Sequence, residues 1–276
     1  MVGNEKLVDL IELCRLSTAA GEAAMQWYKR GDIAISAKHD LSPVTAADLA
    51  AHKVLVDGLP RLLPGVPIVS EEGDVDAKHK MNTVMTEDIY WLIDPLDGTR
   101  DFLSETDDFT VNVALMVHGV PRVGCVVAPA RSQTYVADSS SGAFQVTTDF
   151  KSLLKLQTRT ADPSQLVFLV SRSHLKGEDQ VIRGSYHNAQ IQRVGSALKY
   201  ALIAAGQADI SVRNSPTSLW DTAAAQCVLE AAGGQMLRFD GTPITYRTGR
   251  LINPPFIAVG DAAINWQKIT QNLANG

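Results

Sequence analysis

The sequence predicts an α/β protein whose two α/β lobes, over about residues 1–150 and 151–276, form one continuous unit. Segments with apolar residues at helical spacing alternate with short apolar runs that are typical of strands. Three of these runs, 109–117, 120–128 and 133–137, follow one another closely enough to be successive antiparallel strands. No repeat, low-complexity tract or Pro/Ser-rich linker divides the chain, which favours two lobes over two tethered domains.

The first lobe is predicted to begin with helices and to continue with strands. The second helix should stop at Gly58 and Pro60. Pro95 favours an extended backbone at Asp94, so the apolar strand before Asp94 should end at that residue. The expected elements are helix 7–29, strand 33–36, helix 45–59, strand 67–70, a polar loop over 73–88, strand 91–93, strands 109–117, 120–128 and 133–137, and an edge strand over 143–146.

The second lobe is predicted to alternate strands and helices. Gly233 and Gly234 are a strong signal for the end of a helix. The expected elements are strands 166–170 and 191–194, helix 196–205, strand 208–212, helix 219–232, strand 256–259 and helix 262–275.

Composition and charge exclude several classes of protein. The chain has 276 residues, of which 45% are hydrophobic and 20% charged, and this is enough to build a large core. The net charge of −5 argues against a general binder of nucleic acid polymers, which should carry a basic face. If a protein with this negative net charge binds phosphate, bound metal ions would supply the positive charge that the phosphate needs.

The cysteines and the N-terminus add further limits. Cys14, Cys125 and Cys227 are widely spaced, so we expect reduced buried thiols rather than a disulfide framework or a zinc site. Residues 1–10 lack a basic segment followed by an apolar one, and no apolar stretch could span a bilayer. We therefore expect an intracellular protein without a transmembrane segment.

The segment WLIDPLDGTR at 91–100 carries the strongest indication of chemistry. Asp94 and Asp97 lie on a short, stiffened turn from which both carboxylates can reach one ion. Gly98 lets a ligand approach the backbone, and a short helix starting near Thr99 would offer free N–H groups to an anion. Carboxylates for a hard cation beside amides for an oxyanion indicate Mg²⁺-dependent phosphate chemistry. The alternative is an Asp-Pro turn with a helix cap.

Other acidic residues could join this site, although each has a structural explanation. Glu71 and Glu72 end a strand, and since successive side chains point to opposite faces, only one of them should reach the two aspartates. Asp221 begins a helix, where it is either a cap or a third metal ligand from the other lobe. Asp48 follows Thr45 by three residues, which is the spacing of a capping box; the alternative is a base that polarises a hydroxyl or a water.

A second group of residues could hold another phosphate or a ribose. Ser196 and Lys199 are spaced i, i+3 on a predicted helix and should face one side of its first turn. His174 ends a strand, and Arg213 follows another. Each of these has an alternative as a structural or surface residue.

The pieces together resemble the lithium-sensitive, magnesium-dependent phosphatase superfamily of inositol monophosphatase and fructose-1,6-bisphosphatase. Three signatures occur in order, SEE at 70–72, DPLDGT at 94–99 and WDTAA at 220–224, and the resemblance covers nearly the whole chain. Within the superfamily, the chain looks most like the bacterial CysQ group of 3'(2'),5'-bisphosphate nucleotidases. The discriminating segments are SPVTAAD at 42–48, SRSH at 171–174 and GSALK at 195–199.

The resemblance implies a layered α/β sandwich and a Mg²⁺-dependent phosphomonoesterase with two or three Mg²⁺ per site, inhibited by Li⁺. By position, the metal ligands would be Glu71, Asp94, Asp97, Asp221 and the Leu96 carbonyl. The phosphate-binding turn would be Gly98 and Thr99. The water would be oriented and deprotonated by Thr99 and Asp48, with Glu71 sharing the task. The nucleotide would be held by His174, Ser196, Lys199 and Arg213.

The implied reaction removes the 3'-phosphate of adenosine 3',5'-bisphosphate, giving AMP and phosphate, in sulfur assimilation and nucleotide recycling. The alternatives are an inositol-1-phosphate or sugar-bisphosphate phosphatase with the same metal chemistry and, more remotely, a non-catalytic nucleotide or metal sensor. The implied location is the cytoplasm, and association with the cytoplasmic face of the inner membrane is known in the resembling group. The sequence is silent on oligomeric state.

Overall fold

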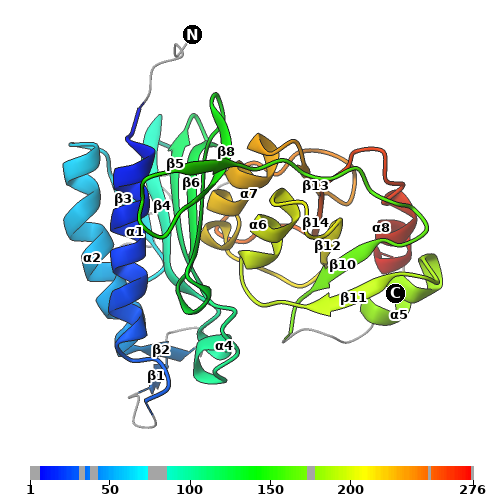
Figure 1. The fold of residues 1–276 in the computed structure, drawn as a ribbon, viewed down its shortest axis with the longest axis horizontal. Helices are drawn as coiled ribbons and strands as arrows, with labels where there is room; N and C mark the ends of the chain where they lie inside the picture. The colour runs from blue at the N-terminus through cyan, green and yellow to red at the C-terminus, as the bar shows by residue number, and fades with distance from the viewer. Residues whose placement is uncertain are drawn as a thin grey trace.

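The computed structural model describes residues 7–30, 35–37, 43–73, 86–172, 178–247 and 250–274. Within these residues, seven strands form one sheet in the order β3-β4-β5-β6-β7-β8-β9, and five form another in the order β11-β10-β12-β14-β13. Helices and sheets alternate as layers across the molecule (Figure 1). The layered α/β fold is the class that the sequence predicts.

The larger sheet carries two helices on its outer face, α1 and α2 (Figure 1). The elements of this half are α1 (Leu10–Met25), β1 (Ile35–Ala37), β2 (Pro43–Thr45), α2 (Ala46–Leu62), β3 (Ile68–Ser70), β4 (Ile89–Asp97), α4 (Thr99–Leu103), β5 (Thr110–Val117), β6 (Val120–Ala128), the 3-10 turn η1 (Pro129–Arg131), β7 (Gln133–Asp138), β8 (Gly142–Val146) and β9 (Leu153–Lys155).

The smaller sheet lies between two helical layers, with α6 and α7 on the side facing the larger sheet and α5 and α8 on the other (Figure 1). Its half contains β10 (Val167–Val170), α5 (Glu178–Ser185), β11 (Gln190–Arg193), α6 (Leu198–Ala204), β12 (Ile210–Arg213), the 3-10 turn η2 (Leu219–Asp221), α7 (Ala223–Ala231), β13 (Gln235–Arg238), β14 (Phe256–Val259) and α8 (Gln267–Ala274).

Strand β4 shows how the apolar sequence builds two cores at once. Trp91 and Ile93 are buried against α1 and α2, whereas Tyr90 and Leu92 are buried on the opposite face, towards α6 and α7. Side chains alternate along a strand, so a continuous apolar run is what a strand covered on both faces requires. The strand therefore runs through the interior of the molecule, and its C-terminal end carries Asp94 and Asp97.

The predicted end of the second helix is wrong. Helix α2 continues through Gly58 and Pro60 to Leu62. A Cβ at Gly58 would lie 2.2 Å from Leu16 Cδ1, so this glycine permits close packing on α1 rather than ending the helix. Pro60 lies near the end of α2, where its missing N–H removes one hydrogen bond only.

Strand β4 is also longer than predicted, because it continues past Asp94 to Asp97. Asp94 pairs with Asn112 and Asp97 with Thr110, so β4 contains one residue more than β5 over this stretch. Such a bulge accommodates a proline that cannot donate to the ladder. The bulge is therefore the reason that Pro95 bends the strand instead of ending it.

Other elements were not predicted at all. The sequence pattern does not indicate the short strands β2, β9 and β13 or the short, largely polar helix α5. The predicted helix 219–232 starts as the turn η2 before α7 begins. Most of the predicted loop over 73–88 and part of strand 33–36 lie outside the described residues.

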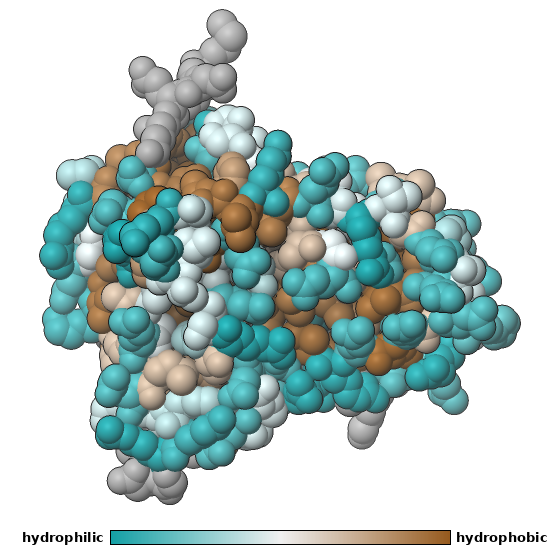
Figure 2. Space-filling model, in the orientation of Figure 1, coloured by the Kyte–Doolittle hydropathy of each residue, from teal (hydrophilic) through white to brown (hydrophobic). Residues whose placement is uncertain are grey.

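Cysteine chemistry and the surface agree with the composition. The three cysteines are buried and free, as expected. Hydrophilic residues predominate on the face drawn in Figure 2. Among described residues, the exposed large apolar side chains belong to separate elements or loops: Leu49, Val120, Leu154 and Ile252. None of the described helices combines the length and apolar character that a membrane span needs.

Candidate active site

Parallel pairing of β3 with β4 brings the first two carboxylates together. Ser70 is in register with Ile93, so the residues that follow, Glu71 and Asp94, emerge at the same edge of the sheet. The Glu71 N–H donates to the Ile93 carbonyl at 3.2 Å, which keeps the two chains paired up to the acidic residues. This pairing selects Glu71 over Glu72 as the partner of Asp94, as one of the two was expected to be.

The bulge in β4 orients the next residues. The Leu96 N–H donates to Asp94 Oδ1 at 3.1 Å, which fixes that carboxylate against the turn. Gly98 then adopts φ +88 and precedes α4, whose first residue is Thr99. A Cβ at Gly98 would meet Ser196 Oγ at 2.1 Å, so glycine is required here both for its backbone conformation and for the close approach of the other lobe.

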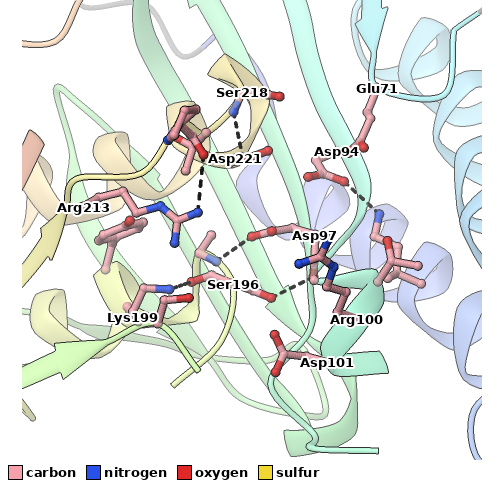
Figure 3. A pocket seen from close by; sticks show the side chains of 18 residues that line it. Glu71, Asp94, Asp97, Arg100, Asp101, Ser196, Lys199, Arg213, Ser218 and Asp221 are labelled. Atoms are coloured by element: carbon pink, nitrogen blue, oxygen red, sulfur yellow. Dashed lines mark hydrogen bonds between the residues drawn. The ribbon is translucent and has the colours of Figure 1, made fainter. Parts of the chain in front are cut away.

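Asp221 completes an acidic group from the second lobe. Carboxylate oxygens of Glu71, Asp94 and Asp221 all lie within 4.8 Å of one another, and Figure 3 shows them around one end of the pocket. Asp221 also accepts the Ser218 N–H at 2.9 Å as part of a capping box at η2. The helix-cap and ligand explanations of Asp221 are therefore compatible, because the cap orients the carboxylate.

The acidic group is electrostatically suited to a cation. Burial, followed by repulsion from Glu71, Asp97 and Asp221, raises the pKa of Asp94 well above its usual value. Burial and the charges of Asp97 and Glu71 likewise raise the pKa of Asp221. Asp94 Oδ2 is buried and has no hydrogen-bond partner among the described residues. A bare carboxylate oxygen amid like charges is a fit for a divalent cation with oxygen ligands.

Asp97 lies beside this group and is held by the other lobe. Its Oδ2 accepts the Ala197 N–H at 2.6 Å, and its backbone carbonyl accepts the Ser196 hydroxyl at 2.8 Å (Figure 3). Burial raises the pKa of Asp97, while the charge of Lys199 and the Ala197 N–H oppose that shift. Asp97 is thus the point at which the two lobes are joined next to the acidic group.

Asp48 and Thr99 come into contact beside the pocket. Asp48 is fully buried and accepts both the N–H and the hydroxyl of Thr45, at 2.8 and 2.6 Å, in a capping box. Its other oxygen, Oδ1, accepts the Thr99 hydroxyl at 3.4 Å. The capping box therefore uses Asp48 Oδ2 and leaves Asp48 Oδ1 to Thr99, which lines the pocket.

Cationic side chains form the opposite wall. Lys199 is buried, with 4% of its surface exposed, and its Nζ donates to the Ser196 carbonyl at 2.7 Å. Burial and the neighbouring Arg213 lower the pKa of Lys199 to about 8. Arg213 and Lys199 both line the pocket (Figure 3).

The predicted placement of Ser196 needs correction. It does not lie on helix α6 with Lys199, but precedes it in a turn with φ +54, because its hydroxyl and the next N–H are drawn to Asp97. His174, the remaining nucleotide-site candidate, lies outside the described residues.

The pocket between the lobes has a volume of about 300 Å³. It contains residues that the sequence analysis missed: Arg100, Asp101, Ser171, Tyr200, Pro216, Thr217 and Ser218. Arg100 and Asp101 directly follow the DPLDGT signature, and that adjacency was the available signal. The others are brought to the pocket by the packing of the second lobe.

Comparison with known proteins identifies the relatives of this architecture. The family model described as "Inositol monophosphatase family" matches residues 7–273. The chain belongs to the inositol monophosphatase family. The resemblance inferred from the three signatures is therefore confirmed. Each signature contains one residue of the acidic group: Glu71, Asp94 and Asp221.

Relatives in this family carry the names of nucleotidases. The 3'(2'),5'-bisphosphate nucleotidase CysQ of Shigella flexneri is 39% identical over 249 residues, which are 90% of this chain and 98% of that protein. The protein of the same name from Haemophilus influenzae is 33% identical over 271 residues, 97% of this chain and 98% of its own length.

Solved structures of the family share the fold. CysQ from Bacteroides thetaiotaomicron superposes with a TM-score of 0.75 at 29% identity, over 91% of this chain and 96% of that one. The Thermotoga maritima IMPase superposes with a TM-score of 0.79 at 24% identity, over 95% and 96% of the two chains, and shows the fold alone.

Proposed function

We propose that this protein is a Mg²⁺-dependent 3'(2'),5'-bisphosphate nucleotidase that hydrolyses the 3'-phosphate of adenosine 3',5'-bisphosphate to give AMP and phosphate. The observation that carries the proposal is one pocket with an acidic group on one wall and Lys199 and Arg213 on the other. A bisphosphate nucleotide has two phosphates, and the two walls offer each of them a different partner. The relatives named above match this chain over nearly their whole length, and their names support the same activity.

The proposed metal ligands are the carboxylates of Glu71, Asp94, Asp97 and Asp221, together with the Leu96 carbonyl. Two or three Mg²⁺ ions held there would neutralise the scissile phosphate and lower the pKa of a water. These residues come from the end of β3, from β4 and from the turn η2, and all of them line the pocket, which supports the proposal. Li⁺ inhibition belongs to the same proposal.

The proposed catalytic residues outside the acidic group are Asp48 and Thr99. The Thr99 hydroxyl donates to Asp48 Oδ1 and lines the pocket, so Asp48 can accept a proton that Thr99 passes on from an attacking water. Glu71 would share the orientation of that water. Gly98 precedes α4 and Thr99 begins it, so backbone N–H groups at this end of the helix would be available to bind the phosphate.

Substrate selection is assigned to the second lobe. Lys199 and Arg213 would bind the phosphate that is not cleaved, with Ser196 shaping the turn beneath it and His174 completing the site. The partner is therefore a small-molecule nucleotide rather than a nucleic acid polymer.

The test is phosphate release in Mg²⁺ from adenosine 3',5'-bisphosphate and inositol-1-phosphate side by side, with and without Li⁺. We expect a strong preference for the nucleotide that Li⁺ abolishes. Preference for the inositol phosphate would leave the metal chemistry and overturn the substrate. Release from neither, with Mg²⁺ binding intact, would favour a non-catalytic sensor.

A further inference from the structure

A buried carboxylate outside the pocket, that of Asp108, joins the two lobes next to the segment that binds Asp97. Asp108 lies between α4 and β5 and has none of its surface exposed. Two guanidinium groups contact it, that of Arg131 at Oδ1 and that of Arg172 at Oδ2. The Gly195 N–H also donates to Oδ2, at 3.0 Å. Arg172 and Gly195 belong to the second lobe, so this one side chain holds both.

The Gly195 contact acts on the segment that binds Asp97. The next two residues, Ser196 and Ala197, donate to the Asp97 carbonyl and carboxylate at 2.8 and 2.6 Å. Three consecutive residues of the second lobe are therefore fixed to two acidic residues of the first. Ser196, between the two other donors, adopts φ +54, which is uncommon for a non-glycine residue.

Packing leaves this segment little freedom to move. A Cβ at Gly195 would lie 2.6 Å from Asp101 Oδ2 and 3.0 Å from Asp108 Cβ. Arg172 contributes from the other side, because it donates to the Arg193 carbonyl at 3.1 Å and its Nε lies 3.6 Å from Asp101 Oδ1. The charges of Asp108 and Asp101 thus keep the strand leading to Gly195 against the first lobe.

We propose that Asp108 is a positioning residue for the metal site, which acts by holding the Gly195–Ala197 segment so that the Ala197 N–H orients the Asp97 carboxylate. Asp108 does not line the pocket and touches no proposed ligand. The inference rests on the proposed metal role of Asp97. Groups that orient a metal ligand commonly change metal affinity or activity about 10- to 100-fold when they are removed.

The test compares Asp108→Asn with Asp209→Asn. Asp209 is a matched control because it is also buried, at 1% exposure, and is also bound by an arginine, Arg159, and by a backbone N–H, that of Val167. Both variants should lose thermal stability. Mg²⁺ binding is measured by calorimetry without nucleotide, and the Mg²⁺ concentration for half-maximal phosphate release is measured separately.

We expect Asp108→Asn to weaken Mg²⁺ binding by about 10-fold or more and to raise the half-maximal Mg²⁺ concentration to match, while Asp209→Asn stays within about twofold of the wild type. A shift within twofold for Asp108→Asn, or an equal shift in both variants, overturns the proposal. If Asp108→Asn does not fold, Arg172→Gln replaces it, since that variant leaves Asp108 with Arg131 and Gly195, and the same twofold limit applies.

The calorimetric arm separates this inference from the proposed function. Weakened Mg²⁺ binding in a protein that does not hydrolyse the nucleotide would support the positioning role and reject the substrate. Nucleotide hydrolysis with unshifted Mg²⁺ binding in Asp108→Asn would do the reverse. A wild-type protein that binds no Mg²⁺ would overturn the inference together with the metal assignment.

Discussion

The Thr99 hydroxyl donates to Asp48 Oδ1 across 3.4 Å, and this contact links the first turn of α2 to the first turn of α4. Because the other Asp48 oxygen is engaged by Thr45, the pair has a fixed orientation at the pocket wall. Thr99→Val keeps the shape of the side chain and removes the hydroxyl. We expect kcat to fall by about 100-fold or more, in the range of general base catalysis, with little change in Tm.

Thr134→Val is the control for that variant. Thr134 lies on β7, and its hydroxyl also has one side-chain partner, Thr18, at 3.3 Å. Steady-state phosphate release and thermal unfolding measured on both variants decide the matter. Equal kcat values in Thr99→Val and wild type would remove Thr99 from the reaction.

Asp94→Asn should have opposite effects on stability with and without metal. The raised pKa of Asp94 means that the folded, metal-free protein disfavours the charged form of this carboxyl group. The free energy of unfolding therefore falls as the pH rises from 3.8, the usual pKa of an aspartate, towards the higher pKa of Asp94 in the folded protein. Neutral asparagine removes that cost. We therefore expect metal-free Asp94→Asn to have a higher Tm than the wild type, by a margin that grows with pH over this window and then levels off.

With Mg²⁺ present the order should reverse, because the wild type gains stability from bound metal and the variant loses a ligand. Turnover should fall by orders of magnitude. Thermal unfolding across pH, with EDTA or Mg²⁺, provides the measurement. A variant that is less stable than the wild type in EDTA at every pH would contradict this account of the acidic group.

Lys199 should confer a pH dependence on nucleotide binding. Burial and Arg213 lower its pKa to about 8, so its charge is present below that pH and is lost above it. We expect KM for adenosine 3',5'-bisphosphate to rise as pH passes through about 8. In Lys199→Met the KM should be higher at pH 7 and should change less between pH 7 and 9.

A simple phosphate monoester without a nucleoside is the control substrate. It needs no contact with the second wall, so Lys199→Met should affect its hydrolysis less than that of the nucleotide. An equal loss with both substrates would take Lys199 out of the nucleotide site.

Gly98→Ala tests the close approach of the lobes at the bulge. Gly98 and Gly65 both have positive φ, +88 and +78, but a Cβ at Gly65 meets nothing within 4 Å, whereas one at Gly98 meets Ser196 Oγ at 2.1 Å. Gly65→Ala therefore measures the backbone penalty alone, about 1–2 kcal/mol. We expect Gly98→Ala to cost more stability than Gly65→Ala and to impair activity, as judged by urea unfolding and phosphate release. Equal losses of stability would show that Ser196 moves aside freely.

Local sequence determined much of this protein. The apolar run before Asp94, the capping box at Thr45 and Asp48, and each of the three signatures consist of residues close together in the chain. From them followed the layered fold, the family and the acidic group of Glu71, Asp94 and Asp221. These features could be predicted because each is set by short-range backbone preference or by the donor chemistry of a residue type.

Tertiary structure alone decided the rest, because it depends on residues far apart in the chain. Gly58 became part of a helix because Leu16 of α1 packs on it, and Pro95 stayed in a strand because β5 accommodates a bulge. Ser196 left the predicted helix because Asp97 binds its hydroxyl and the N–H that follows. The sequence carried no signal for Asp108, whose partners lie 23 to 87 residues away. A local pattern specifies which groups are available, and only the packing of the two lobes specifies which of them meet.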